Sequence, residues 1–370
     1  MLTPFDDYPF HQLPTTFDNA GTSDYRFFDR YWFAIYDPAG KAMLASGLGV
    51  YKNMNVLDGF GSVVIGNTQR NARVSRTLRP NLSEIGAGPL RYEIIEGLKK
   101  FRLILEPNEF DLAFDVTWEG DFPAFEEKPH FQREAGMAIQ DYMRVYQYGH
   151  ASGEIAAGGE HIRFDNWFAF RDRSWGVRAG VGGPAPARST GEAAGLGGRS
   201  TTIIGFAFAT EDYCSNFSVL EDAEGRRVYE DGVLVDRAGK QLKFMKIDHD
   251  LEFEPGTLIL RRARCQLVDQ HGKKHEFTAE PISKPFVYQG YGYFDGYRDR
   301  RGLGSFRGDL LIEGESYDLT NPEKVVDHSG VREFPQTLPL EYPVRITFDG
   351  KAGTADSMVS ILGAHPRYQR

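Results

Sequence analysis

Apolar and polar residues alternate in short runs along most of the chain. After Asp24 the sequence reads YRFFDRYWFAIYDPAGKAMLASGLGVY, in which two largely apolar runs flank the turn from Asp37 to Gly40. Runs of this length around a glycine-containing turn are typical of antiparallel strands joined in a hairpin. Further short apolar runs occupy residues 61–66, 90–95, 101–105 and 110–118. The first half of the chain is therefore predicted to be β-structure, and only residues 131–146 offer a candidate helix.

The stretch from Phe164 to Arg178, FDNWFAFRDRSWGVR, joins a strand pattern to a concentration of charge. Its first half alternates at period two, as a strand does. It then places Asp172 between Arg171 and Arg173, where neighbouring cations are expected to lower the pKa of the carboxyl group. Two interpretations stay open: these residues line a pocket in which chemistry occurs, or they form a buried ion network that locks two domains together.

A change of composition follows directly. Residues 179–200 are mostly Gly, Ala and Pro with almost no large apolar side chain, which predicts a flexible loop or a lid. The second half then returns to short strands and turns at 201–209, 217–220, 227–235, 242–248 and 257–267. We therefore expect an all-β protein of two antiparallel barrels, with an N-terminal domain at 1–178, the loop at 179–200 and a C-terminal domain at 201–370.

Composition narrows the classes of partner. The formal net charge of −9 disfavours nucleic acid and anionic membrane surfaces. No stretch approaches the length of a membrane span, and the N-terminus lacks the pattern of a signal peptide. The chain has only two cysteines, which fits a reducing compartment, so a cytoplasmic location is expected. Aromatic residues make up 13% of the chain and are suited to a β-core or to the walls of an apolar pocket.

Polar groups recur beside aromatic runs at two further places. The run from Gln289 to Tyr297 alternates, which would put three tyrosines and Asp295 on one face of a strand, an arrangement better suited to a pocket wall than to a core. Tyr51 and Asn53 follow an apolar strand in the same way. In contrast, the residues around His249 point to alternate faces, and no phosphate-binding loop occurs, so neither a metal nor another cofactor is expected.

Three motifs resemble a known superfamily. The first is His11 to Pro14 with the run from Tyr31 to Pro38, the second runs from Gly47 to Gly59, and the third runs from Tyr146 through RDRSWG at 171–176. They resemble the tandem lipocalin-like, or calycin, superfamily of carotenoid hydratases, AttH-type proteins and fungal survival-factor proteins, and most of all its uncharacterised bacterial two-domain members. The resemblance implies two lipocalin-like barrels, the RDRSWG strand at their junction and a cavity for an apolar ligand.

The chain departs from the carotenoid hydratases within these motifs. Those enzymes carry His where this sequence has Arg173, and they place a Tyr and an Asp early in the second domain. Here Asp212 could take the part of the acid, but the Tyr is missing from the range 206–212. The resemblance therefore carries the fold and leaves carotenoid hydration without support.

Two functions remain open. The chain is a cofactor-free lyase, hydratase or isomerase acting on a small terpenoid, lipid or aromatic molecule in a barrel cavity, or it is a non-catalytic carrier of hydrophobic metabolites. Association into a homodimer also stays open. The candidate catalytic residues are Asp172, Arg173, Trp175, Asp295 and Tyr297. The candidate ligand-binding residues are Tyr51, Asn53, Tyr148, Trp167, Asp212, Tyr291 and Tyr293.

Overall fold

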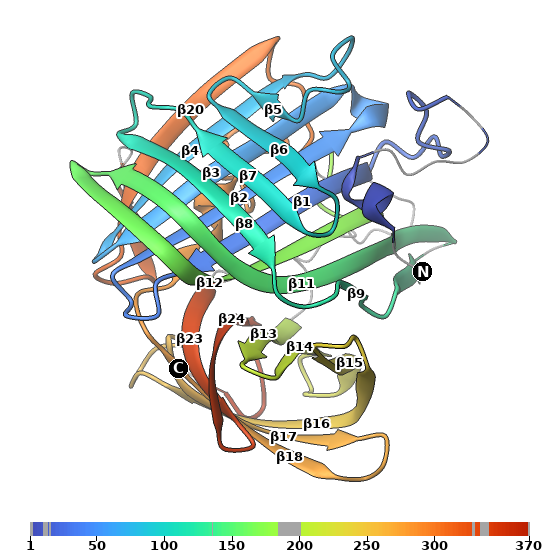
Figure 1. Ribbon diagram of the computed structural model, residues 1–370, viewed down its shortest axis with the longest axis vertical. Helices are drawn as coiled ribbons and strands as arrows, with labels where there is room; N and C mark the ends of the chain where they lie inside the picture. The colour runs from blue at the N-terminus through green and yellow to red at the C-terminus, as the bar shows by residue number, and fades with distance from the viewer. Residues whose placement is uncertain are drawn as a thin grey trace.

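A computed structural model describes residues 3–9, 14, 16–134, 136–183, 201–327, 330–333 and 340–368. These residues form two large antiparallel β-sheets (Figure 1) and short 3-10 helices at η1 (Pro4–Asp7), η2 (Lys52–Met54) and η3 (Tyr288–Tyr291). The predicted all-β fold with two barrels is confirmed. No helix in the described ranges is long and apolar enough to cross a membrane.

The first sheet curls into a nearly closed barrel. Its strands, in chain order, are β1 (Phe27–Tyr36), β2 (Ala42–Tyr51), β3 (Val56–Ile65), β4 (Thr68–Thr77), β5 (Gly86–Ala87), β6 (Leu90–Glu96), β7 (Lys100–Leu105), β8 (Leu112–Gly120), β9 (Phe125–Glu126), β10 (His130–Glu134), β11 (Met137–Ala157), β12 (Glu160–Arg178), β20 (Leu310–Asp318), β21 (Lys324–Asp327) and β22 (Gly330–Glu333). In space the order is β22-β21-β20-β4-β3-β2-β1-β12-β11-β8-β7-β6-β5.

The second sheet closes into an eight-stranded barrel through pairing of β18 with β23. It contains β13 (Thr201–Thr210), β14 (Tyr213–Glu221), β15 (Arg227–Asp236), β16 (Gln241–Phe253), β17 (Leu260–Asp269), β18 (Lys274–Pro281), β23 (Leu340–Phe348) and β24 (Lys351–Leu362), with the short β19 (Phe286–Val287) attached to β23.

The sheets do not divide where the sequence changes composition. Strand β20 lies beside β4, with Leu310 opposite Arg76 and Asp318 opposite Thr68, so a late segment of the chain extends the first barrel. The expected C-terminal domain therefore contributes to both sheets. Most of the predicted flexible loop, residues 184–200, lies outside the described residues. The candidate helix at 131–146 was wrong, because this range belongs to β10 and β11.

Packed side chains occupy both barrel interiors. Phe33, Phe101 and Trp118 meet in the first barrel, with ring centroids 5.5–6.1 Å apart. In the second barrel, Phe217 packs edge-on against Phe277 at 5.0 Å. Aromatic pairs at these distances are those of a filled core. A ligand site is therefore better sought outside the two interiors.

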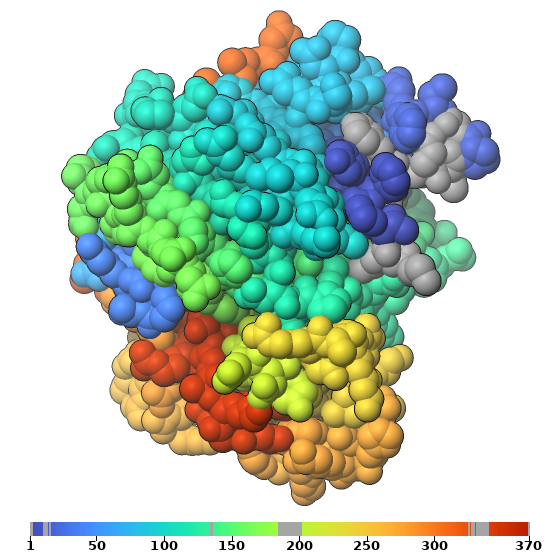
Figure 2. Space-filling model, in the orientation of Figure 1, coloured from blue at the N-terminus to red at the C-terminus, as the bar shows by residue number. Residues whose placement is uncertain are grey.

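The outer faces of the two barrels pack against each other. Every residue of β1 and of β2 is buried, because one face of each strand points into the first barrel and the other faces neighbouring segments of the chain. The green strands β11 and β12 lie directly above β13, β14 and β24, and no gap separates the two lobes in this view (Figures 1 and 2). The hydroxyl of Tyr148 donates a hydrogen bond across this junction to the carbonyl of Ser215 at 2.7 Å.

Candidate functional site

Three adjacent strands of the first barrel present an ordered set of side chains to the junction. In the register of β1, β12 and β11, Asp172 lies between Trp32 and Tyr146. Ser174 lies two residues further along β12, on the same face, between Arg30 and Arg144. Because side chains in directly opposed positions lie about 5 Å apart, each set forms a short row across the sheet.

Asp172 faces this junction without a close ion pair. Its nearest cation is the Arg144 guanidinium, with Nε 4.0 Å from the carboxylate, and both side chains are 20% exposed. Burial raises the pKa of Asp172 above its ordinary value and Glu127 adds to the rise, although Arg144 and Arg30 act in the opposite direction. The predicted depression of this pKa was therefore wrong.

The two arginines next to Asp172 point the other way, into the first barrel. Arg171 forms a bidentate pair with Asp7 of η1, at 2.5 and 3.0 Å, and Arg173 pairs with Asp29 of β1. Successive residues of a strand alternate faces, so neither guanidinium can neutralise Asp172. The ion network predicted for RDR does exist, but Asp172 is not part of it.

Trp175, another candidate catalytic residue, belongs to this inner face as well. It lies beside Arg173, whose guanidinium carbon is 5.8 Å from the indole centroid. The structure thus separates Asp172 from both Arg173 and Trp175, and the three do not converge on one point.

A buried carboxyl pair faces the same junction from the second barrel. Glu341 on β23 accepts a hydrogen bond from the Tyr291 hydroxyl at 3.0 Å, and Asp356 on β24 accepts one from the Tyr36 hydroxyl. Burial raises the pKa of Glu341 well above its usual range, and the charge of Asp356 adds to the rise. Burial also raises the pKa of Asp356, to about 6, with Asp172 contributing. Two adjacent carboxyl groups with raised pKa values hold a shared proton.

Aromatic rings surround this pair. Trp32 stacks on Tyr288 at 5.7 Å with an interplanar angle of 18°, and it meets Tyr291 edge-on at 4.9 Å. On the other side, Tyr36 stacks on Phe168 at 6.1 Å. Burial raises the pKa of Tyr288 well above its usual range, and Glu341, Asp356 and Asp172 all add to it, so these carboxyl groups lie around one tyrosine. We call this set of three carboxyl groups and its aromatic walls the junction site.

The tyrosine-rich segment from Gln289 to Tyr297 is not the predicted strand. It forms η3 followed by turns, with positive φ angles of 50° at Phe294 and 64° at Asp295. Tyr291 and Tyr293 reach the junction, where the Tyr293 hydroxyl accepts a hydrogen bond from Arg30.

The other two residues of that predicted face lie apart from it. Asp295 is exposed in a turn and accepts a hydrogen bond from the amide of Arg300. Tyr297 packs under the Arg307 guanidinium, whose carbon is 3.6 Å from the ring centroid.

Most other predicted ligand-binding residues are engaged in contacts within the protein. The amide of Asn53 donates to the carbonyls of Thr22 and Asp24. Trp167 stacks on Phe164 at 4.0 Å. Asp212, the possible counterpart of a hydratase acid, pairs with Lys351 while half exposed.

Two tyrosines from the same predictions are fully buried. Tyr148 joins the two barrels, as described above. Tyr51 contacts the backbone of Gly49 and Gly304, where any side chain would collide with its ring. Of the predicted set, only Asp172, Tyr291 and Tyr293 meet at the junction site, together with the structural Tyr148 at its margin.

Sequence reasoning missed the carboxyl pair and its nearest walls. Glu341 and Asp356 are the single acidic residues of their strands, LEYPVRITF and KAGTADSMVSIL, and that was an available signal. Trp32 and Tyr36 were part of a recognised motif but were not assigned to the site. Nothing in the local sequence indicates that β1, β23 and β24 meet.

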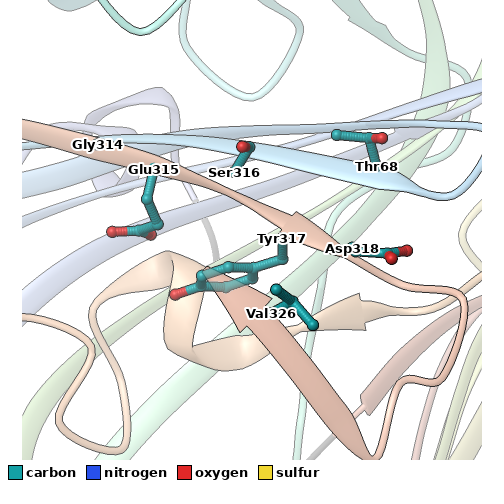
Figure 3. Close-up of a pocket in the computed structure, with 7 residues that line it drawn as sticks. All are labelled: Thr68, Gly314, Glu315, Ser316, Tyr317, Asp318 and Val326. Atoms are coloured by element: carbon teal, nitrogen blue, oxygen red, sulfur yellow. The ribbon is translucent and has the colours of Figure 1, made fainter. Parts of the chain in front are cut away.

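A separate recess of about 550 Å³ lies along β20 and is lined by Thr68, Gly314, Glu315, Ser316, Tyr317, Asp318 and Val326 (Figure 3). Its carboxylates are already bound within the protein. Arg73 donates to Glu315 at 2.6 and 2.5 Å, and Asp318 accepts from the amide and hydroxyl of Thr320. We therefore place the candidate chemistry at the junction site. In the described residues, no group of three or more His, Cys, Asp or Glu is arranged to hold a metal ion.

Comparison with known proteins places this architecture. A family profile, the family of unknown function DUF8625, matches residues 2–331. The chain belongs to this family. No curated protein matches the sequence.

Solved structures show the same two-barrel arrangement. A Nitrosomonas europaea protein assigned as AttH is similar over 92% of this chain and 93% of its own, with 13% identity and a TM-score of 0.54. Kievitone hydratase from Nectria haematococca is similar over 91% of this chain and 89% of its own, with 11% identity and a TM-score of 0.50. The resemblance of the sequence to AttH-type and hydratase proteins is thus confirmed at the level of the fold.

Proposed function

We propose that the chain is a lyase of the hydratase type, or an isomerase, that transfers protons to and from a small apolar molecule at the junction site. The observation that carries the proposal is the carboxyl pair Glu341–Asp356, buried among aromatic rings with raised pKa values. A general acid works best when its pKa lies near the working pH, and burial beside a second carboxyl group is how proteins achieve this.

The carboxyl pair suits the addition of water to a carbon–carbon double bond. Its shared proton passes to one carbon of a substrate double bond, and positive charge develops on the neighbouring carbon. Water adds there, and the carboxylate left behind takes the proton that the water loses. The pair then holds one proton again, so no oxidant or reductant is consumed. Without the addition of water, the carboxylate removes a proton from the next carbon beyond the cationic one, which shifts the double bond and gives an isomer.

The surroundings suit such a charged intermediate. Aromatic rings attract positive charge at their faces, and Trp32, Tyr288 and Tyr291 lie together beside the carboxyl pair. Asp172, beside Trp32 on the first barrel, adds negative potential, as its effect on the pKa of Asp356 indicates. A solved structure of the same fold is named kievitone hydratase, which is compatible with this chemistry.

The proposal is tested with oxygen-18 water. The purified protein is incubated in this water with a panel of unsaturated terpenoids, fatty acids and aromatic alkenes, and products are analysed by mass spectrometry. We expect one panel member to gain labelled water, or to gain deuterium in the isomerase case when heavy water is used.

Matched variants connect any activity to the pair. Glu341→Gln and Asp356→Asn should each lower turnover by roughly a hundredfold or more, the effect of losing a general acid or base. Arg163→Gln, an 81% exposed position on β12, should leave it unchanged. Turnover that survives both carboxyl substitutions would contradict the proposal, whereas a co-purified ligand recovered without chemical change would favour the carrier.

A further inference from the structure

Two arginines beside the junction site carry hydrogen-bond donors that the protein does not use. Arg30 is 4% exposed, and its Nη1 donates to the Tyr293 hydroxyl. Its Nη2 has no hydrogen-bond partner among the described residues, and the same is true of the Nε of Arg144. A buried donor left without an acceptor destabilises the folded protein, and more so when it is charged. A ligand that supplies an acceptor would satisfy such a donor.

The two guanidinium groups are placed to act together. They flank Ser174, which is 4% exposed, in the row next to the one that holds Asp172. Arg178 follows on the same face of β12, near Phe28 and Tyr142. The row therefore offers several N–H donors and a hydroxyl within one patch of the junction.

The acidic groups around this row leave some of its hydrogen-bond donors unused. Glu127 lies 3.3 Å from Arg144 Nη1, but it also lies 3.2 Å from His130 Nε2 and is shared between them. Asp58, near Arg30, accepts the amide of Gly304 at 2.6 Å. Asp172 approaches Arg144 only at 4.0 Å. Two N–H donors of the row therefore have no acceptor among the described residues.

We propose that the row Arg30–Ser174–Arg144 is an oxyanion subsite, and that the substrate of the junction site is an apolar molecule bearing an acidic oxygen, as a carboxylate, phenolate or enolate. Planar guanidinium forks bind such oxygens through charge-assisted hydrogen bonds. The charged end of the substrate lies at the arginines, and its apolar body extends over Trp32 and Tyr288 toward the carboxyl pair. This inference rests on the proposed function for the use of the site, and it adds the class of molecule.

The test uses two probes that differ only in charge, 2-naphthoate and 2-naphthamide. Binding is followed by calorimetry and by quenching of tryptophan fluorescence. The wild-type protein should bind 2-naphthoate roughly tenfold or more tightly than the amide, because one additional charge-assisted hydrogen bond is worth at least about 1.4 kcal/mol. Arg30→Gln and Arg144→Gln should each lower this preference severalfold, while Arg163→Gln should leave it unchanged.

Asp172→Asn should change the affinity for 2-naphthoate in the opposite direction. It removes the carboxylate that competes with the probe for the same arginines, so the affinity for 2-naphthoate should rise. This arm decides the matter if the arginine variants fail to fold, which circular dichroism reports. Equal binding of both probes, or a weaker affinity in Asp172→Asn, would overturn the subsite.

The outcomes also separate the subsite from the proposed function. Glu341→Gln should keep the naphthoate preference, because it leaves the arginines in place. A protein that prefers naphthoate through Arg30 and Arg144 but performs no proton transfer would retain the subsite and lose the enzyme. A protein that turns over an alkene but does not distinguish the two probes would retain the enzyme and lose the subsite.

Discussion

Arg171 and Asp172 are neighbours in sequence, but they face opposite sides of β12 and lie in different environments. Inside the first barrel, Arg171 and Asp7 are 1% and 0% exposed and share two hydrogen bonds. On the junction side, Asp172 has only a 4.0 Å approach to Arg144, and each is 20% exposed. The inner charges are fully paired and fix the fold, whereas the outer charges keep capacity for a further partner.

Breaking the inner pair should have the largest effect. Asp7→Asn removes the charge that compensates Arg171 in the barrel interior. Removing one partner of a buried pair costs about 3–5 kcal/mol, so the free energy of unfolding should fall by that amount. Denaturant unfolding measures it. A loss below about 1 kcal/mol would show that the inner pair is not what distinguishes the two faces.

The carboxyl pair, unlike the inner ion pair, should lower the stability of the folded protein at neutral pH. The pKa of Asp356 is raised to about 6 from 3.8, so the folded protein binds a proton more tightly than the unfolded chain. Its contribution therefore improves as the pH falls from about 6 to about 4, by on the order of 2–3 kcal/mol for two pKa units. At neutral pH this contribution is a destabilisation.

Asp356→Asn removes that contribution together with the part of the raised pKa of Glu341 that Asp356 causes, while carboxylates outside the pair titrate alike in both forms. The variant should be more stable than the wild type at neutral pH, and the advantage should vanish near pH 4. Thermal melts of both proteins across this range measure the difference. An advantage that does not change with pH would contradict the raised pKa.

Asp172→Asn should change stability little. The attraction of Asp172 to Arg144 and Arg30 is offset by the cost of burying its carboxylate, so we expect a change below about 1 kcal/mol. Compared with Asp7→Asn in the same unfolding assay, this variant tests whether neighbouring positions of one strand differ in role. A loss as large as that of Asp7→Asn would place Asp172 among the structural charges.

Asp212→Asn should have the smallest effect. Its pair with Lys351 is half exposed, and exposed pairs contribute about 0–1 kcal/mol. Both the unfolding free energy and the turnover of any identified substrate should stay close to those of the wild type. A loss of turnover would restore the role that the sequence comparison left open for this residue.

Local sequence patterns were sufficient for the strands and insufficient for the site. Alternation at period two identified the strands around RDRSWG, because that period follows from backbone geometry alone. The same alternation was misleading at Gln289 to Tyr297, where positive φ angles at Phe294 and Asp295 produce turns.

The site itself depends on contacts between distant segments. Asp7 meets Arg171 across 164 residues, and Tyr36 meets Asp356 across 320. No pattern within a single strand contains such a partner, so the pairing state of each charge could not be predicted. The strand face on which each residue lies could have been predicted, and it already separates Asp172 from the arginines on either side.

The place of β20 beside β4 has a consequence for biosynthesis. Arg73 on β4 precedes its partner Glu315 by 242 residues. The edge of the first barrel therefore stays open while most of the chain is still being translated. The second barrel is likewise completed only by β23 and β24, near the C-terminus. Open strand edges recruit foreign strands, and pairing across long separations is slow. A ribosome that stalls before residue 310 therefore releases two unfinished barrels with exposed edges, a substrate for chaperones and for aggregation.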